Sequence, residues 1–293
     1  PSGITYGTTL SGTQLNATVQ ESSSNNTTVD ATCVYTPALN TLLDVGTQTL
    51  SVTCTPTNSN KYETVSKTVT IVVSARPITI TADAKSKTYG DSDPTLTYQI
   101  TSGSLVGSDA VTGALNRASG ENVGTYTIAR NTIAISSNYT ITYVSANLTI
   151  TTKAITVTAA AKTKIYGASD PSLTYSITTG GSLIGADSFT GSLTRNAGTN
   201  VGTYAITQGT LALSSNYVLT YVSANLTITQ KPITVTGDTL SKNGADPDPT
   251  LTYQITSGGP LVGSDSFTGA VTRDSGTATG DYAITQGTLA LSS

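Results

Sequence analysis

The sequence predicts an all-β fold, organised as a tandem array of small modules. About a third of the 293 residues are Ser or Thr, and together with Val, Ile and Tyr they suit a pleated β surface. Met is absent, Glu is rare, and no window places apolar residues at helical spacing over three turns. The segments 77–81, 154–158 and 232–236 read PITIT, AITVT and PITVT, which indicates a repeat of about 77 residues.

The repeat length divides the chain into four modules with almost no linker between them. We expect a first module at residues 1–75 and three repeats at 76–152, 153–230 and 231–293, the last of which stops before its final strand. The first module holds strand-like runs separated by turns, as in a β-sandwich, at 14–19, 31–36, 48–55 and 64–73. Short junctions limit bending, so the array is expected to form an elongated rod of roughly 120 Å.

Recurrent positions mark the elements of the three repeats in order. An opening strand leads to a Leu-Thr-Tyr strand, a Gly-x-Asp turn, a single Gly, an Arg and a Gly-x-Tyr strand. In the first two copies a further strand follows, whose alternation through Tyr139, Ile141 and Tyr143 resumes as Leu148 and Ile150. This slip of one residue predicts a bulge or tight turn near residues 144–146.

Residues 77–293 resemble MBG repeats of the YGX type, which occur in bacterial adhesin-like proteins. The Tyr-Gly pair is present as Tyr89-Gly90 and Tyr166-Gly167, beside the recurrent Gly, Asp and Arg positions. The third copy departs from the motif because it has Gly244-Ala245 in register. The resemblance implies small β-rich modules, β-grasp-like or sandwich-like, in an exported surface protein without catalysis.

The first module resembles the Ig-like repeats of large bacterial surface proteins. The residues on which this rests begin with Ile4-Thr5-Tyr6-Gly7 and continue through 47–52 to 60–62. The two resemblances together imply a bacterial Ig-like β-sandwich followed by three MBG-like repeats, located at the bacterial cell surface or secreted from the cell.

Charge and residue inventory exclude several classes of function. The net charge is −3, the pI is near 4.8 and no Lys/Arg cluster occurs. The sequence therefore does not predict the basic surface that binds nucleic acid or an anionic membrane. No apolar run reaches the 18 residues of a membrane span. Because the chain has no His, it cannot itself build a Ser–His–Asp triad, a Cys–His dyad or a His-ligated zinc site. We therefore expect a protein that is not an enzyme.

Cys33 and Cys54 are the only cysteines, and both lie in alternating runs of the first module. If those runs pair as antiparallel strands, both sulfurs face the core and can form a disulfide, which is typical of an oxidising compartment. The alternative is two buried thiols that pack as small hydrophobic groups. The extracellular type of composition favours the disulfide.

Two further sets of recurrent charged residues have a structural and a functional interpretation. We expect the aspartates of the Gly-x-Asp turns to cap their own backbone; these are Asp109, Asp187 and Asp265. The recurrent arginines either line a repeating anion or sugar site or pair with the preceding aspartate across a turn, and ion pairing or solvation is the favoured interpretation. These are Arg117, Arg195 and Arg273.

Calcium is the one cofactor that the acidic turns suggest. Asp91 and Asp93, and again Asp246 and Asp248, offer oxygen ligands at alternate positions. No complete D-x-D-x-D-G loop exists, and solvated turn acids are the alternative. No other metal or cofactor is expected.

The sequence therefore predicts a non-enzymatic stalk segment of an extracellular bacterial surface or adhesin-like protein, acting as a rigid spacer or fibre. One alternative is a self-assembling filament subunit completed by strand exchange with neighbouring copies. Another is a multivalent glycan-binding repeat, in which tyrosines stack on sugars. The surface ligand, if there is one, is not predicted.

Overall fold

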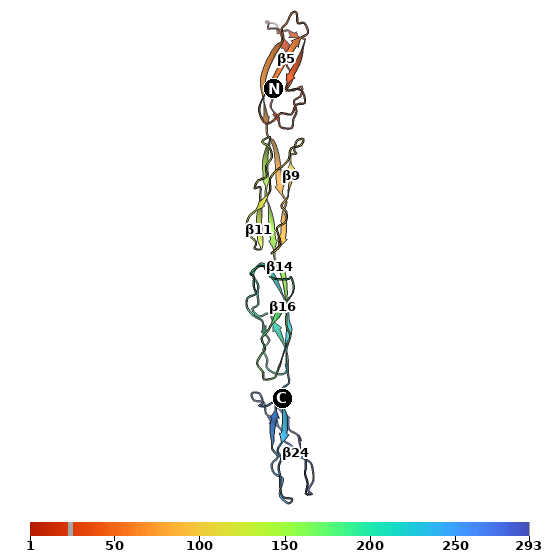
Figure 1. The fold of residues 1–293 in the computed structure, drawn as a ribbon, viewed down its shortest axis with the longest axis vertical. Coiled ribbons are helices and arrows are strands. Elements are labelled where there is room, and N and C mark those ends of the chain that lie inside the picture. Colours follow the sequence, from red (N-terminus) through yellow and green to blue (C-terminus); the bar gives the residue numbers. More distant parts are fainter. Residues whose placement is uncertain (23–25, 293) are drawn as a thin grey trace. The chain divides into compact units, whose positions relative to one another are not determined.

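The computed structural model describes residues 1–22 and 26–292, and this part of the chain forms strands and turns with no helix (Figure 1). The expected all-β tandem architecture is confirmed. By contacts, the chain divides into two compact units, Pro1–Thr152 and Lys153–Ser293. The expected first and last modules include residues 23–25 and 293, which lie outside the described residues.

The strands of the first unit are β1 (Ile4–Thr5), β2 (Val19–Gln20), β3 (Thr28–Val29), β4 (Ala31–Thr36), β5 (Gly46–Pro56), β6 (Val65–Ser74), β7 (Arg76–Ala82), β8 (Lys85–Thr88), β9 (Tyr98–Ser102), β10 (Asn116–Arg117), β11 (Gly124–Ala129), β12 (Tyr139–Val144) and β13 (Ala146–Thr151). Those of the second unit are β14 (Lys153–Ala159), β15 (Lys162–Ile165), β16 (Tyr175–Thr179), β17 (Thr194–Arg195), β18 (Gly202–Thr207), β19 (Tyr217–Val222), β20 (Ala224–Thr229), β21 (Thr234–Gly237), β22 (Tyr253–Ser257), β23 (Phe267–Thr268), β24 (Thr272–Arg273), β25 (Ile284–Thr285) and β26 (Ala290–Leu291).

The first module is built around a four-stranded sheet in the order β1-β6-β5-β4. Antiparallel pairing of β4 with β5 sets Cys33 directly opposite Cys54, and a disulfide joins the two residues, whose Cα atoms are 4.0 Å apart. The strand expected at 14–19 is wrong apart from its last residue. Gln14 and Leu15 lie in a turn whose backbone amides donate to the Ser11 carbonyl, and the Gln14 side chain accepts hydrogen bonds from Ser11 in return.

Each of the first two repeats is a sandwich of two sheets. In the first repeat the sheets are β12-β7-β9 and β10-β11-β13-β8, and in the second they are β16-β14-β19 and β15-β20-β18-β17. Ala82 of β7 packs with Ile128 of β11 and Leu148 of β13 in one buried cluster, so side chains from both sheets fill the space between them. Of the two module folds expected, the sandwich is the one observed.

The slip in alternation near residue 145, for which we expected a bulge or a tight turn, marks the point where the chain crosses from one sheet to the other. β12 runs parallel to β7 in one sheet, whereas β13 pairs with β11 and β8 in the other. Ser145 alone connects them. The buried side changes as the chain crosses between the layers, which shifts the hydrophobic positions by one residue.

Candidate functional site: module contacts and a cleft in the third repeat

Within the first unit, the first module and the first repeat share one hydrophobic cluster. β6 of the first module ends at Ser74 and β7 of the repeat begins at Arg76, so a single residue separates the modules. The buried cluster contains Ile78 and Tyr139 from the repeat and the following residues from the first module: Tyr6, Leu10, Leu15, Leu43, Leu50, Ile71 and Val73. Bending at this boundary would expose apolar surface to water.

A carboxylate of the repeat is hydrogen-bonded at this contact by two tyrosines. The hydroxyl of Tyr6, from the first module, donates to Asp109 Oδ2 at 3.0 Å, and that of Tyr139, from the repeat itself, donates to the same oxygen at 2.6 Å. The Tyr139 hydroxyl also accepts from the amide of Val106 at 2.8 Å. The two rings meet edge to face at 5.5 Å. Burial, together with the nearby Asp109 carboxylate, raises the pKa of Tyr6 and of Tyr139.

The role expected for Asp109 is therefore wrong. Its carboxylate accepts hydrogen bonds from tyrosines of two modules, whereas the turn that carries it is closed by its own amide, which donates to the carbonyl of Val106 at 3.0 Å. A turn closed by the backbone leaves the side chain available for the neighbouring module.

Two more polar groups bridge the same boundary. The side-chain amide of Asn138, the residue before Tyr139, donates to Asp44 Oδ1 and accepts from the backbone amide of Val45, both at 2.9 Å. Arg76 donates to the carbonyl of Ser104 at 2.9 Å and, at 3.5 Å, to the carbonyl of Tyr6. Sequence reasoning gave none of these residues a role between modules, because each lies far along the chain from its partner.

The second unit contains a related contact between the second and third repeats. The hydroxyl of Tyr166 donates to Asp265 Oδ1 at 3.5 Å, at the outer limit for a hydrogen bond. Next to it, Gly167 lies so close to Val262 that a Cβ on this glycine would overlap the valine methyls. Within the second repeat, the Tyr217 hydroxyl donates to Asp187 at 2.7 Å, as Tyr139 does to Asp109 in the first.

A second recurrent cluster joins Lys, Asp and Arg inside each repeat. Asp93 accepts from Lys87 at 2.7 Å and from Arg117 at 2.6 Å, and the guanidinium also lies over the ring of Tyr126. The second and third repeats contain the same set: Lys164, Asp170, Arg195 and Tyr204, then Lys242, Asp248, Arg273 and Tyr282. In each repeat the arginine and, to a smaller extent, the lysine lower the pKa of the aspartate to about 2.

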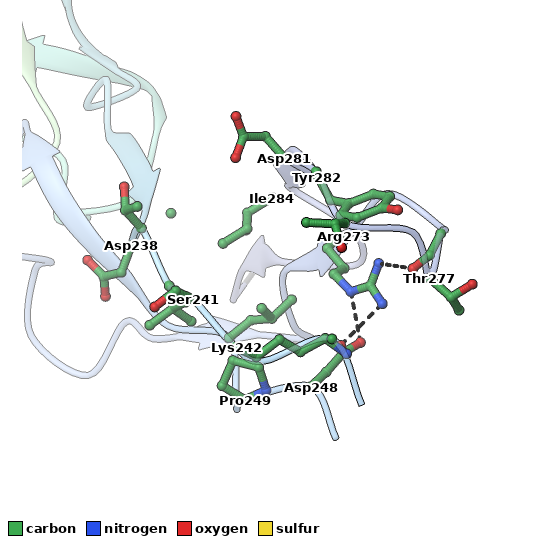
Figure 2. Close-up of a pocket in the computed structure, with 18 of the residues that line it drawn as sticks. Asp238, Ser241, Lys242, Asp248, Pro249, Arg273, Thr277, Asp281, Tyr282 and Ile284 are labelled. Atoms are coloured by element: carbon green, nitrogen blue, oxygen red, sulfur yellow. Dashed lines mark hydrogen bonds and ion pairs between the residues drawn. The ribbon is translucent and has the colours of Figure 1, made fainter. Parts of the chain in front are cut away.

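The third repeat contains a cleft of about 540 Å³ (Figure 2). In the figure, Asp238 and Ser241 lie across an open space from Tyr282 and Ile284, with Arg273 bonded to Asp248 at one end. The apolar lining includes Gly237, Leu251 and Ile284, whose counterparts in the first repeat surround Leu148 of β13; these counterparts are Ala82, Leu96 and Ile128. Among its described residues, the third repeat has no strand equivalent to β13 or β20.

The open cleft changes the exposure of the ionic cluster beside it. The lysine side chain is 4% exposed in the first repeat and 9% in the second, but 33% in the third. In the first two repeats the segment that carries this lysine is a strand, β8 or β15, paired with β13 or β20. In the third, residues 238–243 form no strand. Within residues 231–292 no strand pairs with this segment, so both the core and the edge of the sheet are open there.

Comparison with known families identifies the repeats. Residues 78–149, 155–227 and 233–292 each match the MBG domain (YGX type), and together they make up more than half of the chain. The chain belongs to the MBG domain family. Among solved structures, it is similar to "Protocadherin Gamma B7 extracellular cadherin domains 1-4", with 9% identity, a TM-score of 0.24, and coverage of 81% of this chain and 74% of that chain. No curated protein matches it.

The Tyr-Gly pair of the MBG motif lies at the contact between repeats in the second unit, and the first module carries the same pair as Tyr6-Gly7. Sequence reasoning assigned Tyr6-Gly7 only to the Ig-like resemblance. The signal that could have connected the two pairs is a Tyr-Gly that directly follows a short strand. The structure gives both tyrosines the same backbone hydrogen bond: the amide of Tyr6 donates to the carbonyl of Ser74, and the amide of Tyr166 donates to the carbonyl of Thr229.

The arginines of the MBG modules form ion pairs, but with the aspartate about 24 residues earlier in the chain and not with that of the Gly-x-Asp turn. Calcium binding at Asp91, Asp93, Asp246 and Asp248 stays a prediction. Both carboxylate oxygens of Asp93 and of Asp248 accept from cationic side chains. In the described part of the chain, no group of three or more acidic, Cys or His residues is arranged to hold a metal ion, and no helix is long and apolar enough to cross a membrane.

Proposed function

We propose that this chain is a non-enzymatic stalk segment of an extracellular bacterial surface or adhesin-like protein, acting as a rigid spacer. The observation that carries the proposal is the direct contact between consecutive modules within each unit, made by an apolar cluster and a Tyr–Asp hydrogen bond in the first unit and by Tyr166, Gly167 and Asp265 in the second. A spacer needs such contacts, because free hinges between modules would let it fold back on itself.

The extracellular location is supported by three independent features. The chain belongs to the MBG family, the two cysteines form a disulfide, and the surface is rich in Ser and Thr with only 11% charged residues. Disulfides persist in oxidising compartments. A low-charge hydroxyl surface stays hydrated without a strong field that would attract charged partners.

Distances between spin labels on adjacent modules test the proposal in the intact chain. Labels at Thr70 and Thr127 span the contact in the first unit, and labels at Thr203 and Ser275 span that in the second; all four residues are exposed. Both native cysteines are in the disulfide, so introduced thiols would be the only reactive ones. We expect one narrow distance distribution for each pair. Broad distributions for both pairs in the wild-type chain would contradict a rigid spacer.

In a second candidate, a filament subunit, a strand from a neighbouring copy would occupy the cleft of the third repeat. The equivalent space in the first two repeats holds β13 and β20, whose Leu148, Ile150, Leu226 and Ile228 are at most 1% exposed. An extended segment with Leu and Ile at alternate positions would therefore complete the sheet by β-augmentation.

A peptide with the sequence of residues 223–229, SANLTIT, tests this candidate. We expect it to bind the intact chain and to protect the amides of residues 280–285 from hydrogen exchange, while a control peptide carrying Leu226→Asp and Ile228→Asp does not bind. Equal behaviour of the two peptides would contradict the strand-acceptor role. A filament also requires association that increases with protein concentration, which light scattering measures.

The glycan-binding alternative is weaker on the contacts observed. The recurrent tyrosines of the Gly-x-Tyr strand lie under the arginines and donate to backbone carbonyls four residues earlier; they are Tyr126, Tyr204 and Tyr282. A ring face already covered by a guanidinium does not offer that face to a sugar.

A further inference from the structure

We infer that the Gly-x-Asp turn of the first and of the third MBG repeat is a receptor for the Tyr-Gly pair of the module that precedes it in the same unit, although the two preceding modules differ in fold. This inference rests on the stalk proposal and specifies which residues select the partner in a module contact. We call the Tyr-Gly pair, which is Tyr6-Gly7 or Tyr166-Gly167, the key. The receptor turn is the segment 106–109 in the first repeat and 262–265 in the third.

The receptor turn is closed by a hydrogen bond of its own backbone. In all three repeats the aspartate amide donates to the carbonyl three residues earlier at 3.0 Å, from Asp109 to Val106, from Asp187 to Ile184 and from Asp265 to Val262. The glycine of each turn adopts a φ between 55° and 58°. A turn held by its own backbone presents the carboxylate and the preceding apolar side chain in a fixed arrangement.

The key is the same in two modules of different architecture. Tyr6-Gly7 belongs to the four-stranded sheet of the first module, whereas Tyr166-Gly167 belongs to a two-sheet repeat. In both, the pair directly follows a short strand that runs parallel to the last strand of its module. In both, the tyrosine hydroxyl donates to the receptor aspartate of the next module. The similarity therefore lies in the docking element and not in the fold of the module.

The glycine of the key is required for close approach. Gly7 has φ +97° and Gly167 has φ +83°, a region that other residues rarely adopt. A Cβ on Gly7 would lie 2.9 Å from a methyl of Val106, and one on Gly167 would overlap Val262. Both partners are the apolar residue that opens the receptor turn. The tyrosine hydroxyl thus contacts the last residue of the turn, and the glycine contacts the first.

The third repeat has no key. Gly244 stands where the other repeats have Tyr, and Ala245 stands where they have Gly. Neither of these two residues has a side-chain donor for a receptor carboxylate, and Ala245 adds a methyl at the position of closest approach. We therefore assign the third repeat as a module that docks on the module before it but does not offer this contact itself.

The labelled chains described above test the inference with point variants. Tyr6→Phe keeps the ring but removes the hydroxyl, so we expect the Thr70–Thr127 distribution to broaden, while the Thr203–Ser275 distribution is unchanged. Tyr166→Phe should broaden the Thr203–Ser275 distribution and leave the Thr70–Thr127 distribution unchanged. Losing a hydrogen bond to a carboxylate in a partly buried contact should raise the ratio of open to docked molecules roughly tenfold. Tyr62→Phe is the matched control, because Tyr62 also donates to a carboxylate, that of Glu21, but within the first module.

A glycine pair provides a second, independent readout. Gly7→Ala should open the first contact, whereas Gly12→Ala should not, because nothing lies within 4 Å of a Cβ at Gly12. If Tyr6→Phe and Gly7→Ala both leave the narrow wild-type distribution intact, the key has no role in docking and the inference fails, although the stalk proposal stands. If the wild-type distributions are already broad, the stalk proposal fails first.

Discussion

At the scale of single residues, the charged side chains of this protein serve mainly to hold local structure. In each repeat one aspartate accepts from a lysine and an arginine that come from separate segments, and so joins them. With only 11% of residues charged, a large share of the cations is committed to these clusters and to the module boundary at Arg76. The guanidinium of each recurrent arginine is therefore already bonded to a carboxylate within its own repeat.

These clusters predict how stability depends on acid. Arg117, followed by Lys87, lowers the pKa of Asp93 to about 2, and Asp170 and Asp248 are lowered likewise, against about 4 for an aspartate in an unfolded chain. A lowered pKa in the folded state stabilises the protein above pH 4, and this stabilisation is lost as the pH falls from about 4 to about 2. Thermal unfolding measured across this range should show that loss.

The variant Asp170→Asn separates this effect from general acid unfolding. It should be less stable than the wild-type chain at pH 7, and the difference should shrink as the pH approaches 2, where Asp170 itself becomes neutral. Asp30→Asn is a suitable control, because Asp30 is in none of these clusters. A constant difference between Asp170→Asn and wild type at every pH would contradict the assignment.

At the scale of elements, the disulfide links two neighbouring strands of the first module. Cys33 and Cys54 are 21 residues apart and pair across β4 and β5. Closing a loop of this length stabilises a domain by about 3 kcal/mol in the chain-entropy model. We expect a reductant to lower the urea midpoint at which the amides of the first module lose protection from hydrogen exchange, and to leave the midpoint of the second unit unchanged. A reduced chain with an unaltered midpoint would contradict this.

In a polypeptide of these 293 residues, the third repeat should be the least stable of the MBG modules, because no described strand covers it as β13 and β20 cover the other two. Ile206 of β18 lies between β17 and β20 and is fully buried, whereas Ile284 of β25 pairs only with β24 and borders the cleft. Hydrogen exchange should therefore be faster for residues 280–285 than for residues 202–207. Equal protection of the two segments would show that the cleft is closed in solution.

The elements could be predicted from the sequence where alternation and repetition agree. The repeat signal found the modules, and the alternating run at Ala31–Thr36 predicted β4 and the opposition of Cys33 to Cys54. The run at 14–19 was misleading, because the alternation of Gln14 and Leu15 also fits a turn with one side chain buried. The pair Tyr6 and Asp109 could not be predicted, since its members are 103 residues apart and belong to modules with different patterns.

At the scale of the whole molecule, the same residue types join two consecutive modules in each unit. A tyrosine hydroxyl, a glycine and a turn aspartate meet in each unit, and the chain reaches the next module within one residue in the first unit and four in the second. Stiffness in this view comes from small, repeated contacts between adjacent modules, as in other quasi-one-dimensional arrays. On the stalk proposal, each MBG repeat would add length to the spacer.

Residual dipolar couplings measured by NMR on the intact chain test this central claim most directly. Two modules that are held rigidly against each other are aligned as one body. We predict that one alignment tensor fits the amides of the first module together with those of the first repeat, and that one tensor fits the second repeat together with the third. Two different tensors within either unit would contradict a rigid contact between its modules.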